Sequence, residues 1–268
     1  MLEIECDDDG VWSGGWCMTR SPETPLELTF LGSGNAFAGD RYWSSFVLNR
    51  RYLFDAPPTL LPHLNKLRIP TLDIAAVFVT HFHADHFFGL PFLFLDYEHL
   101  SNRTEDLVIV APPGAEEIVE SASHLGFPGL TRGSGRYWRI YQEARNGGEG
   151  VAVDLPYRAV SVEQASTTSL DCFGYRVEVG GRVVAYTGDT VMCDGVQELA
   201  KGADAVVLDC SCWGETCEHH MSFEELRRFR KEVPLSTTFV LTHLDVGEPP
   251  AVDMEGMIVA EDFATIRF

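Results

Sequence analysis

The segment HFHADH at residues 81–86 decides how the rest of this sequence is interpreted. It places three histidines and one aspartate directly after the apolar run at 74–80, which predicts a buried strand. Neutral imidazoles and carboxylates are the natural ligands of zinc and related divalent ions. Because a strand end that runs into a loop lets closely spaced side chains converge on one point, the segment predicts a metal site.

Two more predicted strands end in residues that could bind the same metal. Asp189 follows the strand expected at 182–187, in a Gly-Asp-Thr turn where glycine allows close backbone approach. His243 directly follows the strand expected at 238–242. A turn aspartate or a lone histidine is more often structural. That three apolar strands each end at such a residue is hard to explain without a metal.

The pair His219 and His220 precedes a predicted helix and is the next element that agrees with a metal site. Ser222 is expected to cap this helix together with Glu225, because a serine followed three positions later by a glutamate is the capping-box pattern. The helix is expected to extend to about residue 231. The two histidines therefore lie in the segment that leads into a helix.

The sequence contains seven cysteines, and their number and context predict free thiols. The count is odd, and the chain is large with no secretory signal. Three of the cysteines lie close to the two histidines at 219–220, but their spacing fits no standard zinc knuckle. A structural or incidental role is expected, since free cysteine is commonly a small buried hydrophobe. The seven are Cys6, Cys17, Cys172, Cys193, Cys210, Cys212 and Cys217.

Predicted strands come in runs with helices interleaved in both halves of the chain, and no linker divides it. Residues 1–25 form a poorly defined polar lead, and residues 26–268 are expected to form a single domain. Two sheets with helices outside would bury these elements. Strands are expected at 26–31, 45–48, 52–55, 74–80, 107–111, 137–141, 151–162, 174–179, 182–187, 205–210, 238–242 and, in pieces, 257–268. Helices are expected at 59–67, from the turn at 112–114 to about 125, at 196–201 and at 222–231.

Charge and hydropathy weigh against several classes of protein. The formal net charge is -20, from 40 acidic and 20 basic residues. A nucleic-acid groove needs a stripe of Lys and Arg, so this charge argues against one. The longest apolar runs are too short to span a bilayer, and the acidic N-terminal residues lack the apolar region of a signal peptide. A cytoplasmic protein that does not act at a membrane is therefore expected.

The order of motifs resembles the metallo-β-lactamase superfamily, and is closest to the branch that holds ribonuclease Z and the phosphonate-pathway cyclic phosphodiesterase. The resemblance covers residues 26–245, most of the chain. It implies an α/β (α+β) fold, a four-layer αββα sandwich with the metals at one edge between the sheets. The motifs that carry it are LGSG at 31–34, FD at 54–55, the cluster at 81–86, GYR at 174–176, GDT at 188–190 and TH at 242–243.

This resemblance implies a ligand set and a mechanism. The first two histidines of the cluster would bind one ion. Asp85, His86 and His243 would bind the second, and Asp189 would bridge both. A metal-bound hydroxide would attack the substrate, with Asp85 and His220 as the expected catalytic residues. The full expected ligand set is His81, His83, Asp85, His86, Asp189 and His243.

The role of His220 would be to protonate the leaving group, and its neighbour His219 is an alternative for that role. A divalent metal is expected as one or two ions, with zinc ahead of manganese or iron.

The sequence departs from the family at one ligand. The family usually has a seventh ligand, a histidine about six residues before the GYR motif, and here that position is Thr168. The first ion site would then keep only three ligands or be weak. Three protein ligands and a water still make a workable catalytic zinc site, so inactivity does not follow. Gln164 or His219 could substitute, and spacing does not choose between them.

A second departure concerns the substrate. Ribonuclease Z has a long arm that grips transfer RNA between the GYR and GDT motifs, whereas here only residues 177–187 separate them. Because the arm is missing and the chain is acidic, transfer RNA is not expected, and a small-molecule substrate is. The branch is often dimeric, which makes a homodimer one expectation for this chain.

Three functions follow from these observations. The first is hydrolysis of a small phosphodiester or cyclic phosphate, which the branch resemblance and His220 favour. The second is hydrolysis of an ester, lactone or thioester, since the same activated water serves acyl transfer. The third is a degenerate binding protein or a mononuclear iron redox protein, which the missing seventh ligand motivates. The metal content of the purified protein separates the third function from the other two.

Overall fold

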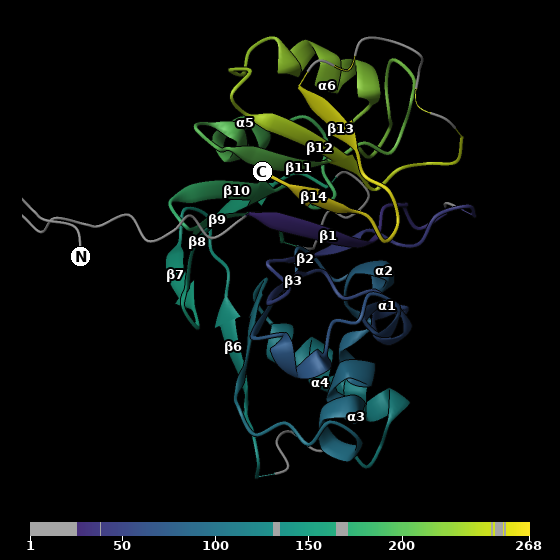
Figure 1. The fold of residues 1–268 in the computed structure, drawn as a ribbon, viewed down its shortest axis with the longest axis vertical. Helices are drawn as coiled ribbons and strands as arrows, with labels where there is room; N and C mark the ends of the chain where they lie inside the picture. The colour runs from purple at the N-terminus through teal and green to yellow at the C-terminus, as the bar shows by residue number, and fades with distance from the viewer. Residues whose placement is uncertain are drawn as a thin grey trace, which may run out of the picture.

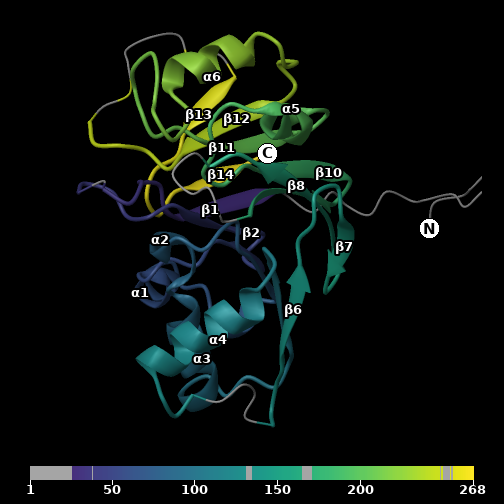
Figure 2. The same ribbon diagram turned by 180° about the vertical axis from the view of Figure 1, so that it is seen from behind.

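The computed structural model describes residues 26–37, 39–130, 135–164, 171–247, 249, 254 and 256–268. Over this part of the chain, two seven-stranded sheets lie face to face, and helices cover the outer face of each sheet (Figure 1). Figure 2 shows the same order of layers from behind. The predicted four-layer αββα sandwich is therefore confirmed. The lead at residues 1–25 lies outside the described residues.

The first sheet is formed mainly by the N-terminal half of the chain. Its strands are β1 (Glu27–Gly32), β2 (Ser45–Leu48), β3 (Tyr52–Phe54), β4 (Ala76–Phe78), β5 (Leu107–Ala111), β6 (Arg139–Glu143) and β14 (Thr265–Arg267). Their order is β14-β1-β2-β3-β4-β5-β6. The strands from β3 to β6 run parallel to one another, and the pairs from β14 to β3 are antiparallel.

The second sheet is formed by the C-terminal half. Its strands are β7 (Glu149–Ala152), β8 (Leu155–Val162), β9 (Cys172–Val179), β10 (Arg182–Tyr186), β11 (Ala205–Asp209), β12 (Thr238–Thr242) and β13 (Met257–Val259). Their order is β13-β12-β11-β10-β9-β8-β7. The strands from β10 to β13 are parallel, whereas β7, β8, β9 and β10 pair antiparallel.

Helices form the two outer layers. The first sheet is covered by α1 (Leu60–Lys66), the 3-10 turn η1 (Thr71–Asp73), α2 (Ala84–Phe87), α3 (Leu90–His99) and α4 (Ala115–Gly126). The second sheet is covered by α5 (Asp194–Ala200) and α6 (Phe223–Arg230). The capping box predicted for α6 is present. Among the described helices, none is both long and apolar enough to cross a membrane.

Alternation along the strands separates three hydrophobic layers. In β3, Phe54 belongs to the core between the sheets and Leu53 to the core under the helices, because successive side chains point to opposite faces. Phe54 stacks between Phe46 and Phe78, with ring centroids 4.6 and 4.8 Å away, and the edge of Tyr186 from the second sheet meets Phe46 at 5.2 Å. These aromatic contacts lock the two sheets together directly below the strand ends that carry the candidate site.

Most predicted elements are present, and the strands at 107–111 and 238–242 have the predicted bounds. Helix α3 is missing from the prediction because Pro91 lies in an apolar run that gives no clear period. The proline occupies the first turn, where the absent N–H has no helical partner to lose. The single strand predicted over 151–162 is instead the hairpin of β7 and β8, which turns at Val153 with φ of 65°.

Candidate metal centre

The candidate site lies where parallel strands of both sheets end. In the first sheet, Asp55 follows β3 and His81 follows β4. In the second, Asp189 follows β10, Asp209 is the last residue of β11, and His243 follows β12. The carboxyl ends of neighbouring parallel strands meet at one sheet edge. Because the two sheets face each other, both sets of strand ends meet at the same place.

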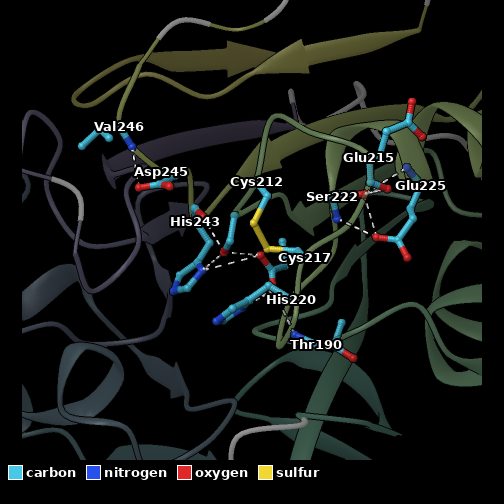
Figure 3. Close-up of a disulfide and its surroundings, with 12 residues drawn as sticks. Thr190, Cys212, Glu215, Cys217, His220, Ser222, Glu225, His243, Asp245 and Val246 are labelled. Atoms are coloured by element: carbon cyan, nitrogen blue, oxygen red, sulfur yellow. Dashed lines mark hydrogen bonds and ion pairs between the residues drawn. A yellow bond between two sulfur atoms is a disulfide. The ribbon is translucent and has the colours of Figure 1, made fainter.

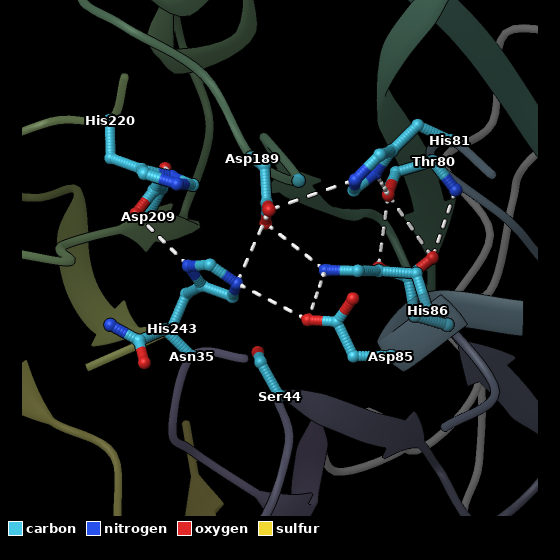
Figure 4. Close-up of polar contacts among 12 residues, drawn as sticks. Asn35, Ser44, Thr80, His81, Asp85, His86, Asp189, Asp209, His220 and His243 are labelled. Carbon is cyan, nitrogen blue, oxygen red and sulfur yellow. Dashed lines mark hydrogen bonds and ion pairs between the residues drawn. The ribbon is translucent and has the colours of Figure 1, made fainter. Parts of the chain in front are cut away.

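The carboxylate of Asp189 lies at the centre of the site (Figure 4). Its Oδ1 is 3.3 Å from Nε2 of His86, and its Oδ2 is 3.2 Å from Nε2 of His243 and 3.7 Å from Nε2 of His81. All four side chains are buried. Two segments distant in sequence, 81–86 and the end of β12, therefore aim imidazole nitrogens at a carboxylate from a third segment.

The segment at 81–86 turns back on itself because helix α2 begins within it. His83 is the residue before the helix and lies with its ring 4.5 Å from that of His81. Asp85 lies in the first turn, and its Oδ2 is 3.5 Å from Nε2 of His86 and 3.9 Å from Nε2 of His243. This single helical turn brings all four polar residues of the segment to one side.

Four buried atoms at the centre of the site have no hydrogen-bond partner among the described residues. They are Nε2 of His81, Nε2 of His86, Nε2 of His243 and Oδ1 of Asp189. Buried polar atoms are almost always paired, and leaving one unpaired costs about 1–3 kcal/mol. Three nitrogen donors and a carboxylate oxygen that converge without partners fit a divalent cation, which would satisfy them together.

The potential ligand atoms form three overlapping groups, and within each group the atoms lie within 4.8 Å of one another. Two of the groups correspond to the division that the resemblance implies: His81, His83 and Asp189 in one, and Asp85, His86 and His243 in the other. The third group joins Asp189 and His243 with Asp209 and His220.

At the position of the usual seventh ligand, Thr168 lies outside the described residues. Gln164, one of its two suggested substitutes, is buried and lines the cavity beside the site.

Asp55 orients two of the histidines, His86 directly and His81 through Thr80. Its Oδ2 accepts hydrogen bonds from Nδ1 of His86 at 2.8 Å and from the hydroxyl of Tyr186 at 2.9 Å. The hydroxyl of Thr80 donates to the same carboxylate and accepts from Nδ1 of His81 at 3.0 Å. Because Nδ1 of both histidines faces a hydrogen-bond acceptor, Nε2 is the nitrogen directed into the site, and it offers a lone pair to a cation once the ring is neutral.

Asp209 performs the equivalent task for the second sheet. Its Oδ2 accepts a hydrogen bond from Nδ1 of His220 at 2.8 Å and one from the backbone N–H of Thr190 at 3.0 Å. Its Oδ1 accepts a hydrogen bond from the hydroxyl of Ser211 at 2.8 Å. The hydroxyl oxygen of Ser211 in turn lies 2.7 Å from Nδ1 of His243. One buried carboxylate therefore orients His220 directly and His243 through Ser211.

Burial and neighbouring charges set the protonation of the site. Burial, reinforced by His86, holds the pKa of His81 well below its usual value, so that its imidazole is neutral. Burial opposes ionisation of Asp189, but His243 and the other histidines hold its pKa well below normal. Burial alone would lower the pKa of His243, yet Asp189 raises it to about 10. A cation that binds here must therefore displace a proton from His243.

A cavity of about 710 Å³ opens next to this cluster. His220 and His219 both line it, but they differ in burial and in their contacts. His220 is partly buried and held by Asp209, with its ring 5.0 Å from that of His243, whereas His219 is exposed. Among the described residues, the lining contains no lysine or arginine; it consists of Asn35, Ala36, Phe37, His83, Ala84, Asp85, Gln164, Asp189, Ser211, Cys212, Cys217, His219, His220, His243 and Asp245.

The prediction that the cysteines are all free thiols is wrong for two of them. Cys212 and Cys217 form a disulfide with a Cα–Cα distance of 5.8 Å (Figure 3). The segment between them turns back, which brings two cysteines five positions apart within bonding reach. The spacing of the cysteines does not indicate this turn. Cys172, Cys193 and Cys210 form no disulfide, as predicted, and Cys6 and Cys17 lie outside the described residues.

Sequence reasoning missed two residues that position the site. Asp209 is the last residue of β11 and directly follows the apolar run at 205–208, although the predicted strand extends to residue 210, and the rule that identifies Asp189 and His243 selects it as well. Ser211 carries no comparable signal, because a serine after a strand is common and its role depends on the neighbouring strand β12. Asp55 belongs to a motif that the sequence displays, but its contact with His86 becomes evident only from the fold.

The chain belongs to the beta-lactamase superfamily, because residues 50–244 match the beta-lactamase superfamily domain. It is similar to ribonuclease Z of Methanosarcina acetivorans, with 28% identity over 90% of this chain and 98% of that protein. Ribonuclease Z of Listeria monocytogenes is 29% identical over 69% of this chain and 62% of its own length.

Solved structures share the fold. The short form of human tRNase Z superposes with a TM-score of 0.71 at 22% identity, over 90% of this chain and 98% of that one. A diphosphatase from the PhnP family superposes with a TM-score of 0.67 at 18% identity, over 91% and 98% of the two chains. At these identities the likeness concerns the fold alone.

Proposed function

We propose that this protein is a metal-dependent hydrolase of a small phosphodiester or cyclic phosphate. The observation that carries the proposal is the convergence of three buried, unpartnered imidazole nitrogens on the carboxylate of Asp189, next to a cavity where His220 is held by a buried carboxylate. Relatives named ribonuclease Z and a structural neighbour named as a diphosphatase point to phosphate ester chemistry.

In this proposal His81 and His83 hold one ion, while Asp85, His86 and His243 hold the other. Asp189 contacts both groups and would bridge the two ions. Zinc is proposed ahead of manganese or iron, because the site is rich in imidazole. When bound, such ions lower the pKa of a water molecule and polarise a phosphoryl oxygen.

His220 is the proposed proton donor to the leaving group. Its Nδ1 is bonded to Asp209, so Nε2 is the atom left to face the cavity. Burial lowers the pKa of His220, but the hydrogen bond that it donates to Asp209 and the charge of that carboxylate more than offset this and raise it. A proton is therefore available at Nε2. As water adds to phosphorus and the ester bond breaks, the departing oxygen takes this proton. Asp85, which also lines the cavity, is the second proposed catalytic residue.

The cavity supports a small substrate. A polynucleotide needs lysine or arginine side chains along its path, and the described lining contains neither. Between β9 and β10 the chain makes a tight hairpin at Gly180 and Gly181. The family resemblance places the transfer-RNA arm of ribonuclease Z at this point of the fold. The relatives are nevertheless named as ribonucleases, so precursor transfer RNA belongs in any substrate panel.

Hydrolysis of bis(p-nitrophenyl) phosphate by the zinc-loaded or manganese-loaded protein tests the proposal. We expect turnover by the wild type, and a loss of about 10²-fold or more in kcat for His220→Ala, the size typical of general acid catalysis. The matched variant His219→Ala should lose far less, because its side chain is exposed and its neighbouring carboxylate, that of Glu218 at 3.9 Å, is exposed as well and does not fix the ring. Equal losses in the two variants would contradict the role given to His220.

A substrate panel separates the proposed function from its alternatives. Lactones and thioesters test acyl hydrolysis, which the same residues could perform. Activity on phosphodiesters alone removes that alternative, whereas activity on acyl substrates alone overturns the proposal. Cleavage of precursor transfer RNA at rates above those with small diesters would replace the small-substrate class by RNA. A single bound iron with no hydrolysis of any member would favour a redox protein.

A further inference from the structure

The disulfide between Cys212 and Cys217 lies in the wall of the proposed catalytic cavity. Both cysteines line the cavity together with Asp189 and His220. Figure 3 shows the disulfide beside His220. The bond closes a short loop, and the chain then continues directly to His220, three residues beyond Cys217. A covalent bond that can be broken by reduction is therefore part of the same surface as the proposed proton donor.

The backbone on the other side of this loop is held by hydrogen bonds. Phe223 donates its N–H to the carbonyl of Cys212 at 2.8 Å, and Ser211 donates its N–H to the carbonyl of Met221 at 3.1 Å. Ser222, the cap of α6, also donates its hydroxyl to the carbonyl of Glu215 at 3.0 Å. His220 therefore lies in a segment that is fixed after it by backbone pairing and before it by the disulfide.

The two bonded cysteines differ from the other described cysteines in access and in partner. Cys172 and Cys210 are buried, and Cys193 is partly exposed without a second cysteine bonded to it. Cys212 and Cys217 are both half-buried, and the intervening residues 214–216 are exposed. Exchange between thiols and disulfides requires access to a sulfur atom. Cys212 and Cys217 are therefore bonded to each other, and a thiol can approach them from the cavity.

We propose that Cys212 and Cys217 form a redox-responsive site in the cavity wall, which exchanges with a dithiol and so sets how firmly His220 is held. The existence of the redox pair stands on the structure by itself. Its effect on turnover rests on the proposed function, because it acts through the proposed proton donor. The site takes a dithiol as its reductant and the corresponding disulfide as its oxidant.

The thiol–disulfide exchange proceeds in two steps, in which electrons and protons balance. A thiolate of the dithiol attacks one sulfur of the pair, so that a mixed disulfide forms and the other cysteine leaves as a thiolate that takes a proton. The second thiol of the reagent then attacks the mixed disulfide and releases the remaining cysteine. Two electrons and two protons move from the dithiol to the protein, and the reagent ends as a disulfide. Oxidation by a disulfide reagent is the reverse.

Reduction should loosen His220 without removing it. The hydrogen bond that His220 donates to Asp209 remains, and so does the backbone hydrogen bond between Ser211 and Met221. The loop that precedes His220, however, regains the conformations that the disulfide excludes. Misplacing a catalytic group by a small distance can reduce a rate by up to about 10²-fold. Because part of the restraint survives, we expect reduction to lower kcat by about tenfold, with a smaller effect on KM.

Thiol trapping tests the redox pair without any activity measurement. The full chain is equilibrated in buffers of varied ratio of reduced to oxidised dithiothreitol, alkylated, digested and measured by mass spectrometry. Cys212 and Cys217 should change together from unmodified to alkylated. The alkylation state of Cys172 and Cys210 should not change, and since Cys210 shares a peptide with Cys212, fragmentation of that peptide locates each modification. Alkylation of both cysteines at every ratio, or protection that disappears with a metal chelator, would overturn the proposal.

The catalytic effect is then tested with variants. Turnover of the wild type is compared with that of the double variant Cys212→Ser/Cys217→Ser under reducing and oxidising conditions, with Cys193→Ser as the matched control. Bound ions are counted in every sample, because dithiols also bind zinc.

The double variant should resemble the reduced wild type and show no redox response, and Cys193→Ser should respond like the wild type. If trapping shows the pair but turnover is equal in both states, the link to His220 is overturned. If no substrate is turned over in either state while the pair still titrates, the proposed function fails and the redox site remains.

Discussion

Nδ1 of His86 lies 2.8 Å from Oδ2 of Asp55, and both side chains are buried. Asp55 comes from the end of β3, one strand away from the segment that carries His86, so the pairing of β3 with β4 determines this contact. The carboxylate keeps the ring proton on Nδ1 and leaves Nε2 to face Asp189. The orientation of a ligand is therefore set by a residue that does not itself reach the centre of the site.

Asp55→Asn should weaken ion binding by the group of Asp85, His86 and His243. An amide can present its N–H₂ to Nδ1, which favours the wrong tautomer, and it loses the charge that supports the imidazole. We expect a loss of about 10- to 100-fold in affinity for zinc, measured by competition with a chromophoric chelator. Asp73→Asn, at an exposed carboxylate in η1, is the control. Unchanged affinity in Asp55→Asn would show that the contact does not tune the ligand.

Gly188→Ala should damage the site through a steric clash. A Cβ on Gly188 would lie 2.6 Å from Cβ of Thr80, the residue whose hydroxyl supports His81, and φ there is +60°. We expect a loss of roughly 2–5 kcal/mol in the free energy of unfolding, from the positive φ and the overpacking together.

Gly181→Ala is the matched control for the clash, measured in the same urea titration. Its φ is +75°, and nothing lies within 4 Å of the added Cβ. This control should therefore lose only the contribution of the backbone, about 1–2 kcal/mol. Equal losses in the two variants would mean that the contact with Thr80 has no effect on stability.

His63 should make stability depend on pH independently of the site. Burial lowers its pKa; Asp262 opposes this shift and Lys66 adds to it. Because the folded-state pKa lies below the unfolded value of about 6.5, the unfolded chain binds the proton more tightly. The stability associated with neutral His63 is therefore present above about pH 6.5 and is lost as the pH falls towards the folded-state pKa.

The comparison of wild type with His63→Gln isolates this effect. Glutamine keeps an amide donor at the position but does not titrate. The difference in free energy of unfolding between the two proteins should shift in favour of the variant between about pH 7.5 and pH 5.5. A difference that stays constant over this interval would show that His63 does not change its protonation on unfolding.

The ligand positions were the most predictable part of the site. Parallel strands deliver their carboxyl ends to one edge, so a ligand-type residue directly after an apolar run can be placed before any coordinates are known. His243 after β12 and Asp189 after β10 follow this rule. The rule applies equally to Asp209, and a systematic use of it would have identified that residue too.

Contacts between elements were not predictable in the same way. The bond between Cys212 and Cys217 depends on the path of an irregular loop, for which the sequence has no periodic signal. The link from Asp209 through Ser211 to His243 depends on the register between β11 and β12, where Asp209 pairs with Thr242. Local sequence fixes strands and their ends, whereas register and loop path are decided by packing of the whole fold.

Counting the ions bound to each chain tests the central claim most directly. Native mass spectrometry of the protein equilibrated with zinc, together with elemental analysis, should show two ions per chain in the wild type, as the two groups of ligands around Asp189 imply. Asp189→Asn should lose at least one of them, since that carboxylate contacts both groups. A wild type that binds no zinc, or an Asp189→Asn variant that retains the wild-type number with equal affinity, would contradict this account of the site.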